Sequence, residues 1–544
     1  MDLEILDADV LCVGGGPAGL MAGIRAAELG AKVIVAEKGN TVRSGSAATG
    51  CDHFRCYMPE IHGPDIKPIV EVVAKTEIGA MKHHDFIRTW LEKSFDIVKL
   101  WDSWGIPMKY QGKYEFAGHV VPGAPRTSLH YSGREQKPIL TAETLKRGAR
   151  ILNRVMVFDL SREGETFIAT GIDTREDKIL VIRATSVVLG TGLCTMLYPS
   201  PTPGWIFNKA YSPSNTGDGR SMAYRVGAKL VNLELTMRWS GLKYLSRCGK
   251  GTWVGVLRDP EDKPVGSVAK PDRRYGDRAA DTAPTFFEEQ AKSGRGPIYM
   301  DCRGISNEDY EYMMYFLEQE GNLALLNHMS REGIDFRRNP IEFMTYEMLL
   351  SGGIYFNEKA ETSVKGLYAA GDERFGAISS AATFGWIAGE NAATYAKTVE
   401  RVTTEKVKET ANEKQALITG MRSRTTGASW KEALLGLQQI MHDYAGTVRS
   451  KSMLEAGLGY LRRFKEQARS SMMAENQHEL KHCLEVMNLL DLGELVFIAA
   501  NERKETRARH VRADYSQADP SMDKLLLVKT SDGKPATEWE EIRR

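Results

Sequence analysis

The sequence predicts an α/β protein built around a parallel sheet, and three observations support this class. A short apolar strand at 10–13 runs directly into a glycine-rich loop and then into an alanine-rich helix at 20–29. A second apolar strand at 32–36 ends in Glu37. Further apolar strands at 184–189 and 365–370 each run into glycine. Strands that alternate with helices in this way are typical of a parallel sheet covered by helices.

The first glycine loop, residues 14–19, predicts a dinucleotide-binding turn. Gly14 permits the tight turn, Gly16 lets the backbone approach a pyrophosphate, and Gly19 lets the helix pack closely on the strand. The N-terminus of the following helix offers N–H groups to the anion. Glu37 follows Gly14 by 23 residues, where a carboxylate can accept hydrogen bonds from both ribose hydroxyls.

The late strands indicate which dinucleotide is bound. The 184–189 strand ends at Gly190-Thr191-Gly192, and the 365–370 strand ends at Gly371-Asp372. Both resemble the paired signatures of two-dinucleotide-fold (Rossmann-like) flavoproteins, so the prediction is FAD rather than NAD. Asp372 is expected to bond the ribityl or pyrophosphate region. The small residues at 376–382 would let a helix N-terminus approach the flavin ring and stabilise negative charge on it.

Composition narrows the class of protein. The chain has 544 residues, and 72 Lys and Arg against 71 Asp and Glu give no electrostatic argument for nucleic acid or an anionic membrane as the main partner. Seven scattered cysteines suggest a reducing compartment and contain no spacing typical of a zinc or iron–sulfur site. No apolar run reaches the roughly 20 residues that span a bilayer. We therefore expect a cytoplasmic protein without a metal of its own.

Several motifs in order resemble the fumarate reductase/succinate dehydrogenase flavoprotein family. They are the first glycine loop, the 214–219 loop with its helix, the stretches 294–301 and 352–354, Gly371-Asp372, and the arginine-rich tail at 505–515. The resemblance covers nearly the whole chain. It implies an α/β fold with a two-dinucleotide-fold FAD domain, an inserted α+β capping domain and a C-terminal helical domain. It also implies a role in anaerobic electron transport.

The chain departs from this family at positions that matter for chemistry. The histidine that holds FAD covalently in the succinate and fumarate enzymes is absent from the run 43–50. The segments around Met348, at 233–239 and at 373–376 also lack the family's C4-dicarboxylate residues. FAD is therefore expected to be noncovalent, and succinate or fumarate is disfavoured as substrate. The noncovalent branch of adenylylsulfate reductase alpha subunits is the closer resemblance, in the runs 43–50, Arg238-Trp239 and 295–301.

The positions of the motifs predict the domain organisation. Residues 1–240 and 345–400 should form one discontinuous FAD domain, residues 241–344 a capping domain over the flavin, and residues 401–544 a helical domain. The residues assigned to FAD are Gly14, Gly16, Pro17, Ala18, Gly19, Glu37, Lys38, Ser44, Gly45, Ser46, Thr49, Gly50, Thr191, Gly192, Asp218, Gly371, Asp372 and Ser379.

Three residues are predicted to act on substrate. Arg238 stands beside Trp239 and can bind an anionic group through two parallel N–H donors. His119 ends a stretch that resembles a substrate-contacting strip of the succinate enzymes and could exchange a proton. Arg126 is a further candidate, with His130 nearby, whereas the pair His83-His84 is expected to be solvated surface.

These predictions combine into an FAD-dependent oxidoreductase subunit. It would pass hydride or electron pairs between a small organic or anionic substrate and FAD, and single electrons would leave through an iron–sulfur subunit in a hetero-oligomer. The docking surface is expected at 462–465 and around 503–512, both rich in basic residues. Two alternatives stay open: a flavin that only relays electrons or supports a larger complex, and a self-contained oxidase or dehydrogenase of the aspartate-oxidase type.

Overall fold

A computed structural model describes residues 2–76, 79–117, 125–202, 205–243, 252–266, 270, 286–374, 376–400 and 404–544. Its central sheet has the strand order β6-β2-β1-β9-β8-β7, with β18 also paired to β9. The strands are β1 (Asp2–Val13), β2 (Val33–Glu37), β6 (Arg150–Asn153), β7 (Val155–Glu163), β8 (Thr166–Asp173), β9 (Lys178–Leu189) and β18 (Leu367–Ala369). Strands β1, β2, β6, β9 and β18 run parallel, whereas β7 and β8 form an antiparallel edge. The predicted α/β class is confirmed.

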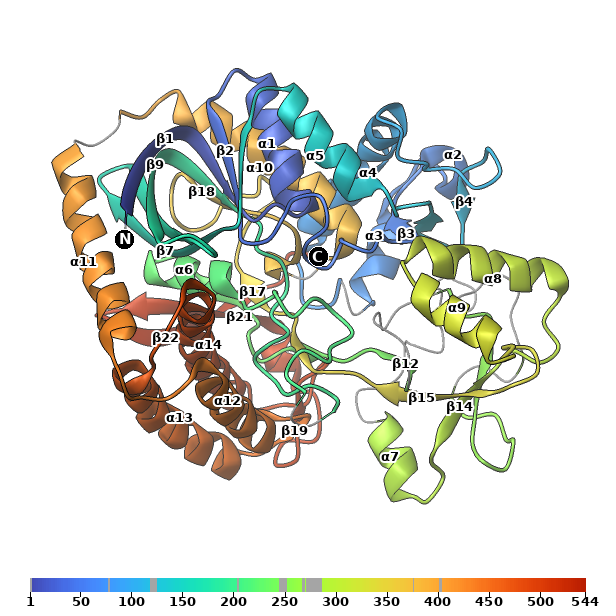
Figure 1. Cartoon of the computed structure of the whole chain (residues 1–544). Coiled ribbons are helices and arrows are strands. Elements are labelled where there is room, and N and C mark those ends of the chain that lie inside the picture. The colour runs from blue at the N-terminus through green and yellow to red at the C-terminus, as the bar shows by residue number, and fades with distance from the viewer. Residues whose placement is uncertain are drawn as a thin grey trace.

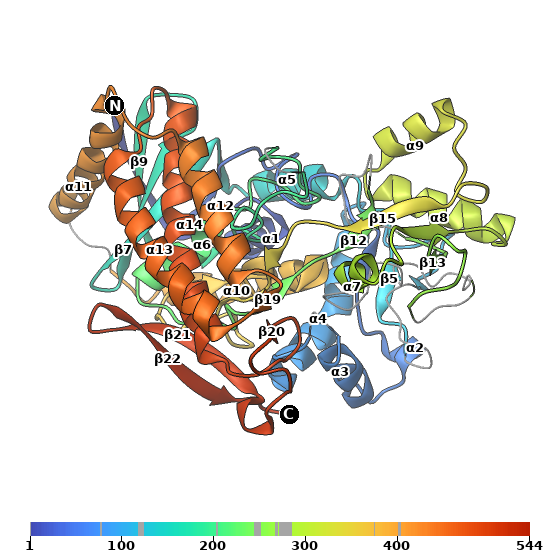
Figure 2. The ribbon, with the colours of Figure 1, turned by 90° about the horizontal axis from the view of Figure 1, so that it is seen from below.

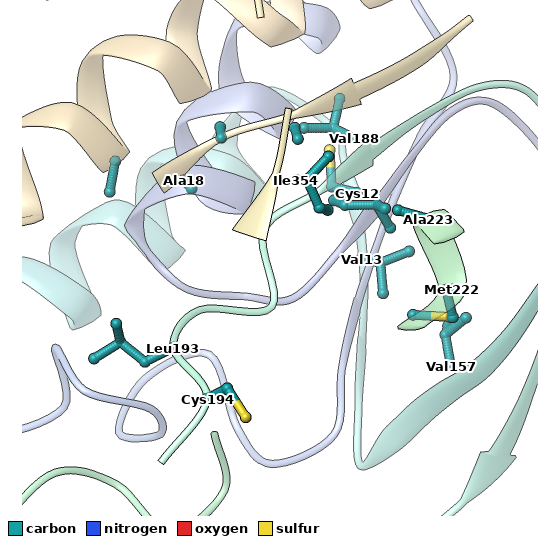
Figure 3. Packing of buried hydrophobic residues seen from close by; sticks show 14 of the residues in the cluster. Cys12, Val13, Ala18, Val157, Val188, Leu193, Cys194, Met222, Ala223 and Ile354 are labelled. Atoms are coloured by element: carbon teal, nitrogen blue, oxygen red, sulfur yellow. The ribbon is translucent and has the colours of Figure 1, made fainter. Parts of the chain in front are cut away.

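The parallel strands are buried because helices cover the sheet. The covering helices are α1 (Pro17–Glu28), α5 (Gln136–Lys146) and α10 (Ala377–Ala396), with α4 (His84–Ser103) packed against α10 (Figure 1). Strand β2 is buried at all five positions, as expected for a central strand. Figure 3 shows side chains of this core, among them Cys12, Val13 and Val188 at the carboxyl ends of β1 and β9.

Two glycines let α10 lie directly on α1. A Cβ at Gly385 would stand 2.4 Å from the carbonyl oxygen of Ala18, and one at Gly389 would stand 2.3 Å from that of Ala22. The late helix therefore packs backbone to backbone on the first helix. This contact brings the two ends of the FAD motifs, almost 360 residues apart along the chain, to the same edge of the sheet.

A smaller layer lies beside α4. It contains α2 (Pro59–His62), α3 (Lys67–Ala74) and a three-stranded sheet of β3 (His53–Arg55), β5 (Ser128–His130) and β4 (Glu115–Phe116). The antiparallel register pairs His53 with His130.

The described residues between 240 and 345 form a second sheet with helices and a core of their own. Its strands, in spatial order, are β12 (Ser240–Leu242), β15 (Ile341–Thr345), β14 (Ile298–Asp301) and β13 (Val256–Arg258). Helices α7 (Phe286–Lys292), α8 (Asn307–Gln319) and α9 (Leu323–Arg331) accompany it. Trp253, Met300 and Phe343 belong to its separate hydrophobic core. We refer to this part as the cap, and both views show it on the side away from the C-terminal helices (Figures 1 and 2).

The C-terminal region begins as helices and ends as a hairpin. The helices are α11 (Thr404–Ser423), α12 (Trp430–Ala445), α13 (Lys451–Ser471) and α14 (Gln477–Glu502). Strand β19 (Val448–Arg449), between α12 and α13, pairs with β20 (Val511–Arg512). After the helices, β21 (Lys524–Ser531) and β22 (Lys534–Glu541) form a hairpin that pairs with β10 (Leu230–Val231), which in turn pairs with β17 (Gly353–Ile354). The last strands therefore extend a sheet that starts in the first half of the chain.

Two sequence expectations about surface residues are wrong. His83 is only 2% exposed, and its Nε2 lies 2.9 Å from Glu540 Oε1 in the hairpin. Arg503 and Arg512 are buried as well: Arg503 bonds Glu234 and Glu505, and Arg512 bonds Asp514. Arg503 holds the tail to Glu234, and Arg512 bonds within the tail, so neither buried side chain can form a docking surface. The sequence showed their charge but not the carboxylates that surround them.

No helix among the described residues combines the length and the apolar character that crossing a membrane requires.

Candidate functional site

A large cavity lies at the carboxyl ends of β1, β2 and β9. It contains about 1360 Å³ of space, counting its open mouth. The first glycine loop lines it at Gly14, Gly16, Pro17 and Ala18. A Cβ at Gly14 would stand 2.3 Å from the carbonyl oxygen of Gly190, so the turn between β1 and α1 touches the turn after β9. A Cβ at Gly16 would meet nothing closer than 4.0 Å, which leaves room for a ligand.

Glu37 holds the two loops at this end of the cavity together. Its Oε2 accepts a hydrogen bond from the Gly15 N–H at 2.7 Å, and its Oε1 accepts one from the Gly39 N–H at 2.7 Å. Behind it, the buried Lys137 donates to the carbonyl oxygen of Gly15. Burial lowers the pKa of Lys137 to about 8, although the charge of Glu37 offsets part of this effect.

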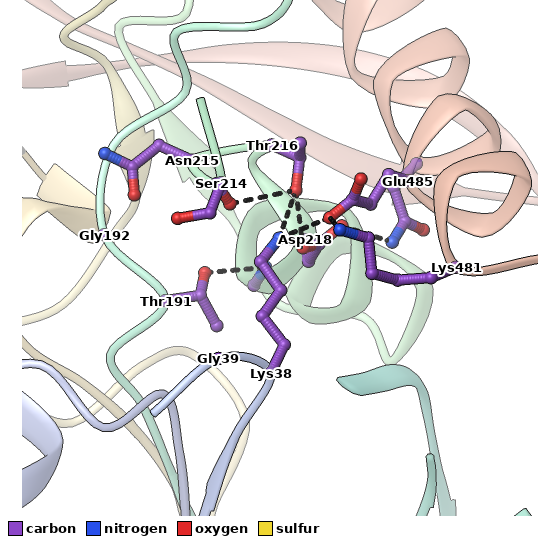
Figure 4. A network of polar contacts seen from close by, with 12 residues as sticks. Lys38, Gly39, Thr191, Gly192, Ser214, Asn215, Thr216, Asp218, Lys481 and Glu485 are labelled. Atoms are coloured by element: carbon purple, nitrogen blue, oxygen red, sulfur yellow. Dashed lines mark hydrogen bonds and ion pairs between the residues drawn. The ribbon is translucent and has the colours of Figure 1, made fainter. Parts of the chain in front are cut away.

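Lys38, which follows Glu37 and also lines the cavity, is the centre of a buried ionic network (Figure 4). Its Nζ lies 2.9 Å from Asp218 Oδ2, 2.8 Å from Glu485 Oε1 and 2.7 Å from Thr216 Oγ1. Asp218 is the first residue of α6 (Asp218–Arg225), and Glu485 lies on α14. Burial alone would lower the pKa of Lys38, but the two carboxylates outweigh burial and raise it. The network joins the second strand of the FAD motif to the C-terminal helices.

Arg220 connects three loops that approach the cavity. Its guanidinium donates to the carbonyl oxygens of Gly192 at 2.7 Å, Gly352 at 3.1 Å and Asp372 at 2.5 Å. Glu373 is its buried ionic partner, at 3.5 Å, and both side chains are 0% exposed. Glu373 also accepts hydrogen bonds from the N–H and the hydroxyl of Thr191. Nothing in the sequence marked this pair, because neither residue belongs to the glycine motifs.

Asp372 caps the start of α10 inside the cavity. Its Oδ1 accepts hydrogen bonds from the N–H groups of Gly376 at 3.2 Å and Ala377 at 3.1 Å. Burial raises the pKa of Asp372, and these N–H groups, Arg220 and Lys82 offset part of that rise. Ala377, Ile378 and Ala381 line the cavity, so the N-terminus of α10 reaches it as expected.

Most of the residues that the sequence assigns to FAD line this one cavity. Those that line the cavity are Gly14, Gly16, Pro17, Ala18, Glu37, Lys38, Ser44, Gly45, Ser46, Gly50, Thr191, Gly192, Asp218 and Asp372. Gly19, Thr49, Gly371 and Ser379 lie outside the lining. A Cβ at Gly19 would overlap the carbonyl oxygen of Gly14, and the Ser379 hydroxyl accepts a hydrogen bond from Trp90 Nε1 at 3.1 Å. Both residues therefore serve packing next to the cavity.

The residues predicted to act on substrate do not all lie at the cavity. His119 lies outside the described residues. Arg238 follows β11 (Thr236–Met237) and is half-buried next to Trp239, which lines the cavity. Arg126 is away from the lining, where its carbonyl oxygen accepts a hydrogen bond from His62 Nε2 at 2.7 Å. His130 lies in β5, opposite His53.

The structure also reveals a buried group that the sequence analysis did not select. Cys51, His53 and Glu320 line the cavity, and Asp52 lies directly behind them. His53 Nδ1 is 2.6 Å from Asp52 Oδ1. A sequence signal existed for part of this group, because Cys51, Asp52 and His53 follow the last glycine of the 43–50 run. Glu320 carried no signal, since the cap folds over the cavity to place it there.

The cavity fits FAD by its form and its chemistry. The first turn of α1 has no side-chain cap and can present its N–H groups to a pyrophosphate, and the open space at Gly16 lets the backbone approach that group. Glu37 stands at the end of β2, where an adenosine ribose would lie. When bound, FAD supplies two-electron hydride chemistry and one-electron transfer. Among the lining residues that the structure describes, His53 carries the only imidazole.

Comparison with known proteins agrees with this assignment. The FAD binding domain family matches residues 9–383, and the fumarate reductase flavoprotein C-terminal family matches residues 435–543. One subunit of the CoM/CoB fumarate reductase of Methanothermobacter marburgensis is 24% identical and covers 97% of this chain and 98% of its own length. L-aspartate oxidase of Streptomyces coelicolor is 23% identical, with coverage of 96% and 93%.

The same fold occurs in a solved structure. Adenylylsulfate reductase of Archaeoglobus fulgidus superposes with a TM-score of 0.84 at 21% identity and covers 99% of this chain and 96% of its own. The match of the FAD binding domain spans more than half of the chain, and the motifs, the cavity and the C-terminal match agree with it. The chain belongs to the family of FAD-binding flavoproteins that includes the fumarate reductase flavoprotein subunits, and it is an FAD-dependent oxidoreductase.

Proposed function

We propose that this chain is the flavoprotein subunit of a redox complex. It moves a hydride between a small organic or anionic substrate and FAD, and single electrons pass between FAD and an iron–sulfur partner subunit. The observation that carries the proposal is the joint arrangement of the FAD cavity and the cap: Cys51 and His53 from the FAD part and Glu320 from the cap line the same space. A cofactor enclosed beside polar groups is arranged for chemistry on a second molecule.

The need for a partner follows from electron counting. A hydride delivers two electrons, whereas an iron–sulfur cluster takes one at a time. Among the described residues, one cluster of neighbouring side chains could ligate a metal, and it contains a single cysteine, Cys51. It therefore cannot hold an iron–sulfur cluster with four cysteine ligands. The matched fumarate reductase relative is named as a subunit, which supports a hetero-oligomer here as well.

The test is purification of the native complex followed by turnover with and without its partner. We expect an iron–sulfur protein to copurify, and we expect dye-linked electron transfer to need only this chain while transfer to the natural acceptor needs both. If the isolated chain turns over in air and yields stoichiometric peroxide, it is a self-contained oxidase, the alternative that the aspartate oxidase match favours. If no substrate reduces the flavin in the complex, the relay alternative is correct.

Arg238 remains our proposed ligand for an anionic group of the substrate. It is half-buried and adjacent in sequence to Trp239, which lines the cavity. Arg238→Lys should keep FAD bound but weaken substrate binding or turnover about 10- to 150-fold, because a point charge cannot replace two parallel donors worth about 1.5–3 kcal/mol. The measurements are the FAD content and the KM and kcat with the native substrate. Unchanged kinetics would remove Arg238 from the site, and His119 and Arg126 would become the next residues to test.

We also propose a reducing compartment such as the cytoplasm, and a division into four segments. The six cysteines that the structure describes are free thiols, which supports the compartment. The separate core of the cap supports the segments 1–240, 241–344 and 345–400, and the change to helices after residue 403 supports 401–544. Limited proteolysis of the complex should cleave near these boundaries.

A further inference from the structure

Three groups that can carry protons meet where the FAD cavity borders the cap. His53 Nδ1 lies 2.6 Å from Asp52 Oδ1 and 3.8 Å from Glu320 Oε1. Their exposed fractions are 8%, 1% and 4%. His53 and Glu320 line the cavity itself, so the group is both shielded from bulk water and open to a ligand.

Separate parts of the fold assemble this group. His53 is the first residue of β3, and Asp52 directly precedes it. Glu320 follows the end of α8 in the cap, and Thr252, also from the cap, donates a hydrogen bond from Oγ1 to Asp52 Oδ2. Asp52 therefore accepts from His53 on one oxygen and from the cap on the other. This second bond fixes the carboxylate and, through it, the plane of the imidazole.

Asp52 is ionised because His53 is its hydrogen-bonded partner. Burial alone would raise the pKa of Asp52, but the charge of His53 and its hydrogen bond outweigh burial, and His130 and Glu320 add to the lowering. Burial raises the pKa of the Cys51 thiol well above its ordinary value, and Glu320 and Asp52 raise it further. Burial likewise raises the pKa of Tyr131. Among the titratable neighbours, Asp52 therefore stays ionised, and Cys51 and Tyr131 stay neutral. Glu320 and His130 are further titratable side chains beside His53.

We propose that His53 exchanges a proton with the substrate of this oxidoreductase and that Asp52 is its positioning residue. The inference rests on the proposed function. In the direction of substrate oxidation, one hydrogen leaves with two electrons as hydride to FAD, and the other leaves as a proton to the imidazole of His53. The substrate loses two electrons and two hydrogens, and the Asp52 carboxylate stabilises the imidazolium that forms. Reduction reverses both transfers.

The same group indicates the class of substrate. Asp52 and Glu320 place carboxyl groups beside His53, and the ionised carboxylate of Asp52 disfavours a second anion next to it. The reacting end of the substrate is therefore neutral and has a hydrogen to exchange, as in a hydroxyl, an amine or a C–H next to a carbonyl. An anionic group of the same molecule would lie toward Arg238.

A metal site is the competing interpretation of these residues. Cys51, Asp52, His53 and Glu320 present ligand atoms within 4.8 Å of one another. However, His53 Nδ1 and Asp52 Oδ1 share a hydrogen bond at 2.6 Å, and a cation would have to displace that proton to bind both atoms. Proton exchange needs no change in the hydrogen bond between His53 and Asp52. Metal binding is therefore treated as one of the results that the experiment below can give.

The experiment measures how the midpoint potential of the bound FAD depends on pH, by dye-mediated dithionite titration of the holoprotein from pH 5 to 9. Reduction adds charge near His53 and should raise its affinity for a proton. His53 then has one pKa beside oxidised FAD and a higher pKa beside reduced FAD. Between these two values, the wild-type potential should fall about 30 mV per pH unit more steeply than that of His53→Gln, since each tenfold change in proton activity shifts a two-electron couple by about 30 mV.

Two further variants make the result specific. Asp52→Asn should keep the steeper segment but move it to lower pH, because the imidazolium loses its counter-charge. His83→Gln removes another buried histidine with a carboxylate partner, and it should match the wild type. If His53→Gln does not retain FAD, the shift in Asp52→Asn carries the test.

Three results would overturn the proposal. The first is a wild-type potential without the steeper segment, and the second is a His53→Gln variant whose potential depends on pH as that of the wild type does. The third is a stoichiometric divalent metal that the wild type holds and that both His53→Gln and Asp52→Asn lose. None of these depends on the proposed function, because the titration requires only bound FAD. Conversely, a purified wild type without FAD would contradict the proposed function and leave the hydrogen-bond geometry of His53 unchanged.

Discussion

At the scale of single residues, buried charges decide most of the site. Lys38 and Arg220 each lie among carboxylates or carbonyl oxygens contributed by segments far away in the sequence. A buried ion is tolerated only when its partners surround it, so each of these residues fixes several loops at once. Removing one partner should therefore harm the protein more than removing a pair on the surface.

Lys38→Met tests this expectation. Its side chain is 17% exposed, and those of Asp218 and Glu485 are each 5% exposed, so the variant leaves two buried carboxylates without their cation. The free energy of unfolding of the holoprotein should fall by about 3–5 kcal/mol, as measured by urea denaturation at pH 7. Lys365→Met is the matched control, because its ion pair with Glu165 is exposed to water and should contribute little to stability.

The difference between wild type and Lys38→Met should depend on pH. Burial alone would raise the pKa of Glu485, but Lys38 and the hydrogen bond from His482 outweigh it and lower that pKa below the ordinary 4.5. A carboxylate with a lowered pKa contributes stability above its unfolded pKa and loses it as the pH falls. The difference should be complete at pH 7 and shrink below about pH 4.5. A difference that grows in acid would contradict this assignment.

FAD should be bound without a covalent link. Ser44, Gly45 and Ser46 line the cavity but offer no nucleophilic nitrogen, and Nδ1 of the lining His53 is engaged with Asp52. Acid precipitation should leave the yellow colour in the supernatant. A fluorescent pellet would refute noncovalent binding, and peptide mapping would then identify the attachment residue.

At the scale of elements, the contact between α1 and α10 is the decisive one. It brings the first and the last FAD motifs together, and it depends on two glycines of α10 that lie against the backbone of α1. The cap is a second example. Its sheet and core are its own, but the end of α8 reaches the FAD cavity through Glu320. Each element therefore acts on the site through one close contact.

Gly385→Ala should separate the two helices. The new Cβ would stand 2.4 Å from the carbonyl oxygen of Ala18, and backbone cannot move aside as a side chain can. We expect a loss of about 1–3 kcal/mol in unfolding free energy and a lower FAD content after gel filtration. Gly420→Ala on α11 is the control, because nothing lies within 4 Å of its Cβ and alanine favours a helix by up to about 1 kcal/mol. Equal stability of the two variants would show that α1 and α10 are not tightly packed.

At the scale of the whole molecule, the cap lies on the side away from the C-terminal helices (Figures 1 and 2). The hairpin β21–β22 and the buried Arg503 tie the C-terminal region into the body of the protein. The outer face of α13 is exposed, and we propose it as the docking face for a partner. Arg462 and Arg463 lie there, although Arg462 pairs with Glu494 at 2.9 Å.

Charge reversal at Arg462 and Arg463 should weaken binding of the iron–sulfur partner. Charges at the rim of an interface mainly set the association rate, so the on-rate should fall and its dependence on salt should become smaller. Surface plasmon resonance at two salt concentrations would measure both. Lys99→Glu with Lys146→Glu is the control, because both lysines are exposed elsewhere on the FAD part. Unchanged binding by the Arg462/Arg463 variant would move the docking face away from α13.

The sequence by itself determined the α/β class, the FAD motifs and the family, because these depend on local patterns: a glycine turn between strand and helix, Glu37 at a strand end, and Asp372 before a helix. Only the tertiary structure decided which polar residues are buried and which of them meet. Arg503 and His83 were predicted at the surface, yet both are buried, and each bonds a carboxylate from a distant part of the chain. Glu320 reaches His53 because the cap folds over the cavity. Such contacts join residues hundreds of positions apart, and no local pattern encodes them.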